Sequence, residues 1–348
     1  MKNKYSFKFG VIVLSLVLIA CSGGSTDAGC PEIDGREINV VATTPMIGEF
    51  VSNVGGDNIN LTVLMPPEAN PHTYEPAPQD AGTIADADLV FYTGLMYEPA
   101  PLVELLENSV CGSEALAEVG ESVFPIEFKE GGHDDHHDDH GEKGHDDHDE
   151  EGHDAHDEEG HDDHSGHEGH GHGAYDPHFW FDPNRVAYAA EFIESKLIER
   201  DPSNTASYQA AGDAYVNVLN SLTGQVSQLI ASIPSQNRKL ITTHESLGYL
   251  EAKFGIEVLS TIIPDLDSSN EISPSQLVGV IDVIEDNNVK VIFIEAEAPS
   301  VYSETIVAET GIKAVEGLWV ETLRPGQTYP EFLITAVELI VENLTNTD

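Results

Sequence analysis

The chain has 348 residues, and 15 basic against 62 acidic residues give it a formal net charge of −47 at pH 7. This length allows two domains of ordinary size, and an apolar content of 40% is enough to give each domain a core. The excess of negative charge makes nucleic acid and anionic lipid surfaces poor partners and cations good ones, so we expect no nucleic-acid partner.

The first residues have the layout of an export signal. Lysines precede an apolar run over residues 9–20, which is too short to span a bilayer as a mature helix. The small residue before Cys21 resembles the lipobox of bacterial lipoproteins, in which the cysteine carries the lipid. We therefore expect residues 1–20 to be a signal peptide and residues 21–35 to be a linker tethered through lipidated Cys21. The alternative is an ordinary signal peptide with a chance cysteine.

Two further cysteines follow in the chain. If Cys21 is acylated, Cys30 and Cys111 remain as an even pair in an oxidising compartment. A disulfide between them and two free buried thiols are both compatible with the sequence.

Strand-length apolar runs then alternate with helix-periodic segments. The predicted strands of the first half cover residues 37–43, 59–65 and 89–92, and the predicted helices cover residues 46–54, 79–87 and 100–108. This alternation indicates a parallel sheet covered by helices.

A tract rich in histidine and carboxylate interrupts this pattern at residues 131–173. It contains thirteen of the sixteen histidines, seventeen Asp or Glu, one Lys and a single apolar side chain, Ala155. Such a segment cannot bury a core, so we expect a disordered, solvated loop that binds metal ions weakly and with fast exchange. It would raise the local metal concentration, and its capture would fade as the imidazoles protonate below about pH 6.5. A passive acidic spacer is the alternative.

The alternation resumes after the tract. Two long helix-periodic segments, residues 184–199 and 203–233, precede the elements of the second half. Its predicted strands cover residues 239–243, 258–263, 289–294 and 313–320, and its predicted helices cover residues 274–286, 303–310 and 329–344. We therefore expect an α/β fold with two lobes, each a mostly parallel sheet covered by helices. The lobes would be residues 36–183 and 236–348, joined by a long helical linker over residues 184–235.

The three histidines outside the tract lie in ordered-looking motifs. His72 follows a predicted strand in a loop with four prolines, and His244 follows a predicted strand of the second lobe. Because ligands bind outside the carboxyl ends of strands in open α/β sheets, we expect both at a cleft between the lobes. The prolines restrict the loop and so lower the entropy that is lost when an imidazole is fixed on a metal.

The sequence resembles the solute-binding receptors of bacterial ABC importers for zinc and manganese, many of which are lipoproteins and some of which were first described as adhesins. The resemblance covers residues 37–344. It rests on His72 with Tyr74, Glu75 and Pro76, on Asp176-Pro177-His178 with Trp180 and Asp182-Pro183, and on Thr242-Thr243-His244 with Gly248-Tyr249. The acidic, histidine-rich insert before the second of these motifs is typical of the zinc branch.

The resemblance implies a metal in the cleft between the lobes, with His72 and His178 as ligands from the first lobe and His244 from the second. Receptors of the manganese branch have a carboxylate where His244 stands. Three neutral imidazoles suit the borderline-soft Zn²⁺, whereas Mn²⁺ prefers more oxygen ligands, so we expect Zn²⁺.

The fourth ligand of the family is commonly an aspartate. Counting from Gly311 places Glu321 at that position, so we expect Glu321 as the fourth ligand and note its longer side chain as a departure from the family. Glu295, Glu297 or a water molecule are the alternatives.

The residues around His178 have further expected roles. Asp176 and Asp182 are candidates to hold an imidazole N–H, although both Asp-Pro pairs also fit simple turns. Trp180 and Phe181 are expected to belong to the core of the lobe.

These expectations describe an extracytoplasmic, membrane-anchored monomeric receptor that delivers Zn²⁺ to the permease of an ABC importer. A manganese receptor and an adhesin-type lipoprotein are alternatives. A secreted zinc hydrolase is disfavoured, because His244-Glu245 begins like the zincin helix motif but position 248 is Gly rather than His. We therefore expect no enzymatic activity.

Overall fold

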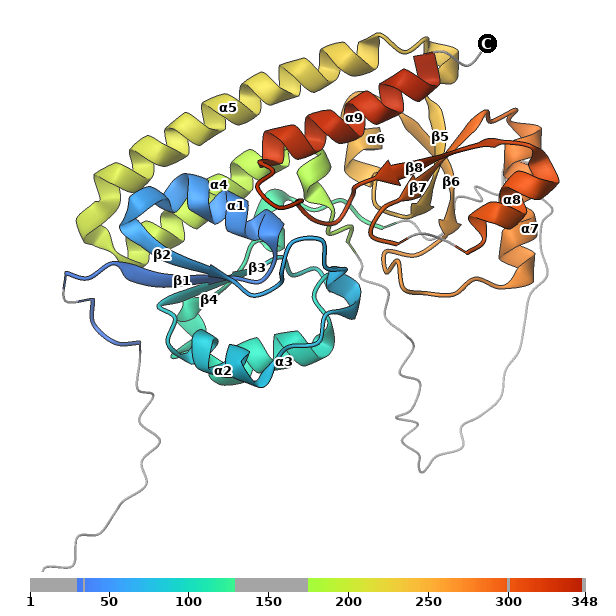
Figure 1. The fold of residues 1–348 in the computed structure, drawn as a ribbon. Coiled ribbons are helices and arrows are strands. Elements are labelled where there is room, and N and C mark those ends of the chain that lie inside the picture. The colour runs from blue at the N-terminus through green and yellow to red at the C-terminus, as the bar shows by residue number, and fades with distance from the viewer. Residues whose placement is uncertain (1–29, 34, 129–174, 299–300, 346–348) are drawn as a thin grey trace, which may run out of the picture.

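A computed structural model describes residues 30–33, 35–128, 175–298 and 301–345 of the chain. The predicted signal peptide, Cys21 and the tract of residues 131–173 lie outside the described residues. Two four-stranded sheets lie side by side with helices on their faces, and all strand pairs are parallel (Figure 1). The predicted α/β fold with two lobes is confirmed.

The two sheets have the same topology. The first has the strand order β2-β1-β3-β4 and the second has the order β6-β5-β7-β8. The strands of the first sheet are β1 (Ile38–Ala42), β2 (Ile59–Val63), β3 (Leu89–Tyr92) and β4 (Leu116–Glu118). The strands of the second sheet are β5 (Lys239–His244), β6 (Glu257–Ile263), β7 (Val291–Glu295) and β8 (Lys313–Leu318). In each sheet the strand order reverses beside the first strand of the lobe, which is where α/β folds of this kind bind ligands.

Helices cover both faces of the first sheet. The helices of this lobe are α1 (Pro45–Gly55), α2 (Pro78–Ala85) and α3 (Ala100–Ser109). Val40 belongs to the large core on the side of α1, whereas the next residue, Val41, belongs to a smaller core with Leu102 and Leu106 of α3. Because both faces of the sheet are buried, its central strands read as continuous apolar runs rather than as an alternation.

Two long helices connect the lobes. They are α4 (Pro183–Arg200) and α5 (Thr205–Ala231). With 27 residues, α5 is about 40 Å long at 1.5 Å per residue, and it arches over both sheets in Figure 1. It packs on α1 and α4 of the first-lobe side and on α6 and α9 of the second lobe, and one apolar core includes both Phe50 of the first lobe and Phe293 of the second.

Four helices among the described residues cover the second lobe. They are α6 (Gly248–Phe254), α7 (Pro274–Asp286), α8 (Ser303–Thr310) and α9 (Tyr329–Thr345). Several helices of the chain begin with a side-chain cap followed by proline, as at Thr44, Asp182 and Ser273. These residues satisfy free backbone N–H groups, and proline fits the first helical position, so the helix starts are well defined.

The sequence did not predict two elements, β4 and α6. With three and seven residues, they are too short to show a clear periodicity. The open question about the cysteines is answered, since Cys30 and Cys111 form a disulfide that joins the start of the described chain to the end of α3. Among the residues that the structure describes, no helix is both long and apolar enough to cross a membrane.

Candidate metal centre

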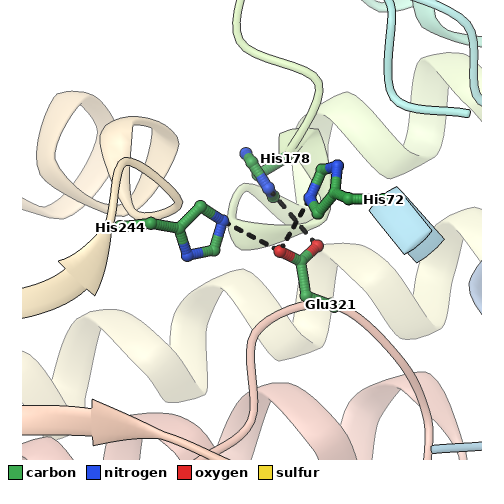
Figure 2. Close-up of side chains that lie close together, drawn as sticks. All are labelled: His72, His178, His244 and Glu321. Atoms are coloured by element: carbon green, nitrogen blue, oxygen red, sulfur yellow. Dashed lines mark hydrogen bonds and ion pairs between the residues drawn. The ribbon is translucent and has the colours of Figure 1, made fainter. Parts of the chain in front are cut away.

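His72, His178, His244 and Glu321 lie together between the two lobes (Figure 2). Each offers one donor atom, and these four atoms all lie within 4.8 Å of one another. Glu321 is at the middle of the group. Its Oε1 lies 3.1 Å from Nε2 of His72 and 2.8 Å from Nε2 of His244, and its Oε2 lies 3.4 Å from Nε2 of His178. The structure thus brings together all four side chains that the sequence nominated.

Each of these side chains is placed by a short, well-defined segment. His72 is the central residue of a 3-10 turn. Its backbone N–H donates a hydrogen bond to the side-chain oxygen of Asn70 at 2.9 Å. His178 stands directly before another 3-10 turn, His244 is the last residue of β5, and Glu321 lies in the segment between β8 and α9. The four side chains are almost completely buried, and even that of His72 is only 5% exposed.

A second layer of carboxylates fixes two of the imidazoles. Nδ1 of His178 lies 2.8 Å from Oδ1 of Asp176, and Nδ1 of His244 lies 2.5 Å from Oε2 of Glu295. Since a carboxylate only accepts hydrogen bonds, each Nδ1 carries the proton and each Nε2 of the neutral ring has a free lone pair. Both Nε2 atoms are buried and make no hydrogen bond, and they face the carboxylate of Glu321 at 3.4 and 2.8 Å.

Glu295, one alternative for the fourth ligand, faces away from the Nε2 atoms. In addition to Nδ1 of His244, it accepts hydrogen bonds from the hydroxyls of Thr242 and Ser246 at 2.9 and 3.2 Å. It stands at the end of β7, next to β5, so the bond between His244 and Glu295 lies where the strand order of this sheet reverses.

Glu297, the other alternative, holds the backbone that carries Glu321. Its Oε1 accepts the N–H groups of Val320, Glu321 and Thr322 at 3.1, 3.0 and 3.3 Å. On the other side of this segment, the indole N–H of Trp180 donates to the carbonyl of Val320 at 2.8 Å. Both lobes therefore fix the position of Glu321.

The expectations for the residues around His178 have separate outcomes. Asp176 holds the imidazole, whereas Asp182 accepts from the N–H of Asn184 and caps α4. Trp180 and Phe181 are fully buried in the core, as expected.

The sequence reading missed Tyr97, whose hydroxyl donates to Glu321. The hydroxyl lies 3.0 Å from Oε2 and 3.0 Å from the backbone carbonyl of that residue. The sequence did indicate that Tyr97 lies near the centre. Tyr97 and Glu98 follow closely after the end of strand β3, at the same edge of the sheet as the loop of His72.

When no metal is bound, protons on the imidazoles balance the negative charge of the carboxylates in the centre. Burial lowers the pKa of His178, but the charge of Glu321 and the hydrogen bond with Asp176 outweigh it and raise this pKa to about 9. Burial likewise opposes protonation of His244, yet the charges of Glu295 and Glu321 hold its pKa well above 6.5. Burial raises the pKa of Glu321, but the three imidazoles together hold it well below its ordinary value. A cation at the centre would take the place of these protons.

Known proteins resemble this chain over nearly its full length. It is 23% identical over 349 residues to the manganese-binding lipoprotein MntA of Halalkalibacterium halodurans, with 99% of each chain covered. It is 28% identical over 354 residues to the high-affinity zinc uptake system protein ZnuA of Bacillus subtilis, again with 99% of each chain covered. Among solved structures, the periplasmic zinc binding protein TroA of Treponema pallidum has the same fold, with a TM-score of 0.71 at 22% identity over 89% of this chain and 100% of that one.

The sequence profile of one family, described as zinc-uptake complex component A, periplasmic, matches residues 40–343. This match covers both lobes, the linking helices and all four residues of the centre. The chain therefore belongs to the family of zinc-uptake complex component A, as its motifs indicated.

Proposed function

We propose that this chain is an extracytoplasmic receptor that binds Zn²⁺ at His72, His178, His244 and Glu321 and delivers it to the membrane permease of an ABC importer. Membership of the family makes the chain a metal-binding receptor of an ABC importer and not an enzyme. The choice of zinc and the assignment of the four ligands are our proposal.

The observation that carries this proposal is the pair of buried Nε2 atoms without hydrogen-bond partners. Leaving a buried polar atom unpaired costs about 1–3 kcal/mol, so two of them side by side need an explanation. A cation supplies it, because in the neutral rings the Nε2 lone pairs of His178 and His244 point to the same space as Nε2 of His72 and the carboxylate of Glu321, and the cation takes the place of the protons there. The carboxylates on Nδ1 select the tautomer that a metal ligand requires.

The donor set favours zinc. Three imidazole nitrogens and one carboxylate oxygen match the four-coordinate sites in which proteins hold Zn²⁺, whereas Mn²⁺ prefers oxygen-rich, six-coordinate sites. The names of the relatives leave the choice open, because one is named for manganese binding and another for zinc uptake. The chemistry of the donors therefore supports zinc as our proposal.

Two further parts of the proposal rest on segments outside the described residues. The tract of residues 131–173 would serve as a weak accessory zinc collector, since its thirteen imidazoles raise the local concentration of the ion beside the tight site. Acylated Cys21 would anchor the receptor to the membrane that holds its permease.

Competition titration of the purified, metal-stripped protein with Zn²⁺ and Mn²⁺ tests the proposal. We expect one tight zinc per chain that survives an excess of Mn²⁺, together with several weak sites. Zinc binding to four protein ligands contributes about 10–16 kcal/mol in small domains, so the loss of one ligand in His178→Ala should cost roughly 3 kcal/mol, or about 100-fold in affinity.

A variant without residues 131–173 separates the two classes of site. It should lose the weak sites and keep the tight one. Loss of the tight site together with the tract would contradict the assignment of the four ligands. Retention of one manganese in the presence of excess zinc would establish the manganese receptor, which the similarity to MntA makes the second candidate.

A further inference from the structure

The hydroxyl of Tyr97 has both of its acceptors on one residue of the metal centre, Oε2 and the carbonyl oxygen of Glu321. Tyr97 is 2% exposed, and its ring stands edge-on to His72 and His178, with centroid distances of 5.2 and 5.9 Å. Packing needs only the ring, so the hydroxyl has a separate role. Because a tyrosine hydroxyl has a single proton to donate, that proton is committed to Glu321.

The backbone around Tyr97 adopts a conformation that side chains usually avoid. Gly94, Leu95 and Met96 have φ values of 76°, 54° and 63°. Left-handed backbone costs an L-residue roughly 1–2 kcal/mol, a cost that applies to Leu95 and Met96 but not to Gly94. Together the three left-handed residues turn the chain so that Tyr97 enters the centre. Strain of this kind persists only where neighbouring groups fix it, and it is concentrated at functional sites.

Two carboxylates fix this loop. Glu98, buried at the end of the loop, accepts the N–H groups of Thr93 and Gly94 at 2.7 and 2.9 Å and the hydroxyl of Thr43 at 2.7 Å. The N–H of Leu95 donates to Glu118 at 2.9 Å. The strained loop is therefore held by charge-assisted hydrogen bonds, which are the strong ones.

Each lobe has a buried glutamate at the point where the strand order of its sheet reverses. In the second lobe, Glu295 stands where the strand order reverses and holds His244. In the first lobe, Glu98 stands at the same kind of place, between the ends of β1 and β3, and holds the loop of Tyr97. One buried glutamate thus orients a donor to the metal, and the other orients a donor to the carboxylate of Glu321.

We propose that Tyr97 is a specificity-determining positioning residue, whose hydroxyl engages Oε2 of Glu321 and so keeps this carboxylate a ligand through one oxygen. A glutamate that binds through Oε1 alone completes a four-donor set with the three Nε2 atoms, which suits Zn²⁺. A glutamate with both oxygens free would add a fifth donor and move the site towards the oxygen-rich shells of Mn²⁺. This proposal rests on the proposed function, because it assumes that the four residues bind the metal.

Tyr97→Phe in the full-length protein tests the proposal, because it removes the hydroxyl and keeps the ring. Zinc affinity is measured by competition with a chromophoric chelator, and manganese affinity by the electron paramagnetic resonance signal of free Mn²⁺. Residues that orient metal ligands affect metal affinity about 10–100-fold. We expect zinc affinity to fall about tenfold and manganese affinity to fall less or to rise, so that the ratio of the two decreases.

Cobalt gives a second readout that packing alone would not change. With Co²⁺ at half an equivalent the tight site fills first, and the intensity of the visible absorption bands reports the coordination number. We expect the intense bands of four-coordinate cobalt in the unmodified protein and weaker bands of higher coordination in Tyr97→Phe. Tyr97→Met removes the same hydroxyl with a different side chain and should change the metal ratio in the same direction.

Tyr208→Phe is the matched control. Tyr208 is also fully buried, and its hydroxyl donates to a carboxylate, Asp201, at 2.9 Å, but it lies on α5 away from the centre. It should leave the metal ratio and the cobalt spectrum unchanged. An unchanged ratio and spectrum in Tyr97→Phe would overturn the role of Tyr97. An unmodified protein that binds no tight zinc would instead overturn the proposed function itself.

Discussion

Nδ1 of His244 and Oε2 of Glu295 are 2.5 Å apart at the ends of the neighbouring strands β5 and β7. Both side chains are fully buried, and Glu295 also accepts the backbone N–H of His244 at 3.2 Å. The carboxylate therefore holds both the ring and the backbone of one proposed ligand. As a consequence, the orientation of His244 is determined by the sheet and not by the metal.

Glu295→Gln should weaken zinc binding about 10–100-fold, because an amide can donate to Nδ1 and so stabilise the tautomer whose Nε2 carries the proton. Chelator competition measures this change. Glu309→Gln, at an exposed glutamate of α8, is the control for the loss of one negative charge. Equal zinc affinities of the two variants would show that the contact with Glu295 does not orient the imidazole.

Zinc binding should release protons at pH 8. The pKa of His178 in the metal-free protein is raised to about 9, so its imidazole is largely protonated at this pH, whereas ordinary imidazoles with a pKa of about 6.5 are neutral. Zinc must displace the proton, and zinc affinity should therefore increase as the pH rises towards 9. Calorimetric titrations in two buffers with different ionisation enthalpies count the protons. Binding enthalpies that are independent of the buffer would contradict this prediction.

The same raised pKa affects the stability of the metal-free protein. Since the folded state binds this proton more tightly than the unfolded state, its contribution is fully present below about pH 6.5 and is lost as the pH rises through about 9. Thermal unfolding of the metal-free protein should thus show a lower midpoint at pH 9 than at pH 6.5. With zinc bound, the loss over this interval should be smaller.

A hydrogen bond across the lobes adjoins the metal centre. Nδ2 of Asn70 donates to the hydroxyl of Ser268 at 3.2 Å, and the same Asn70 accepts the N–H of His72. Ser268→Ala removes only the contact between the lobes, which is worth about 1 kcal/mol, so zinc release into excess chelator should become about fivefold faster. Asn70→Ala also removes the support of His72 and should have a larger effect.

Stopped-flow release experiments measure both rates, with Ser227→Ala as the control for the loss of a serine hydroxyl on α5. A release rate of Ser268→Ala equal to that of the control would mean that this contact does not hold the lobes together around the ion.

The disulfide should stabilise the fold without affecting the metal. Cys30 and Cys111 are 81 residues apart in sequence, and closing a loop of this length reduces the entropy of the unfolded chain. The double variant Cys30→Ser with Cys111→Ser should lose about 2–4 kcal/mol of unfolding free energy, as denaturant titration measures it. Zinc affinity should remain unchanged, because the pair lies on the first lobe outside the metal centre. A large loss of affinity would show that the disulfide positions the site.

Three ligands of the proposed site were predictable, because each histidine lies in a local motif and these motifs resemble those of a known family of receptors. His244 is the last residue of β5 and His72 lies in the loop after β2, and the carboxyl ends of parallel strands meet at one edge of a sheet. The topology alone therefore placed them at the seam between the lobes. The sheets and most helices were predictable for a related reason, since buried parallel strands and long amphipathic helices leave strong periodic signals.

The roles of the carboxylates were not predictable from local sequence. Glu295 and Glu297 stand two residues apart at the end of one strand, and only the structure shows that one holds an imidazole and the other holds a backbone segment. Tyr97 depends on three left-handed residues, two of which are not glycine, and this conformation leaves little trace in the sequence. Contacts that depend on side-chain direction or unusual backbone thus had to come from the structure.

Glu321→Asp tests whether the longer carboxylate is matched to this site. Glu321 contacts all three imidazoles and Tyr97, and its backbone is fixed by Glu297. Because that backbone is fixed, it cannot move towards the imidazoles to compensate for a shorter side chain. The carboxylate oxygens of an aspartate would therefore lie farther from the imidazoles by about one bond length, roughly 1.5 Å. Metal sites tolerate only about 0.2 Å of deviation in ligand distances, so zinc affinity should fall about 100-fold.

Glu321→Gln keeps the length of the side chain and removes its charge. It therefore separates the effect of side-chain length on zinc binding from the effect of charge. The amide oxygen can still reach the ion, but the charge that raises the pKa of His178 is gone, and zinc binding to this variant should release fewer protons at pH 8. Glu321→Asp should still release protons when zinc binds, but its zinc affinity should fall because its oxygens lie farther from the ion. If Glu321→Asp bound zinc as tightly as the unmodified protein, the segment after β8 would have to move, and the contacts with Glu297 and Trp180 would not fix it as we infer.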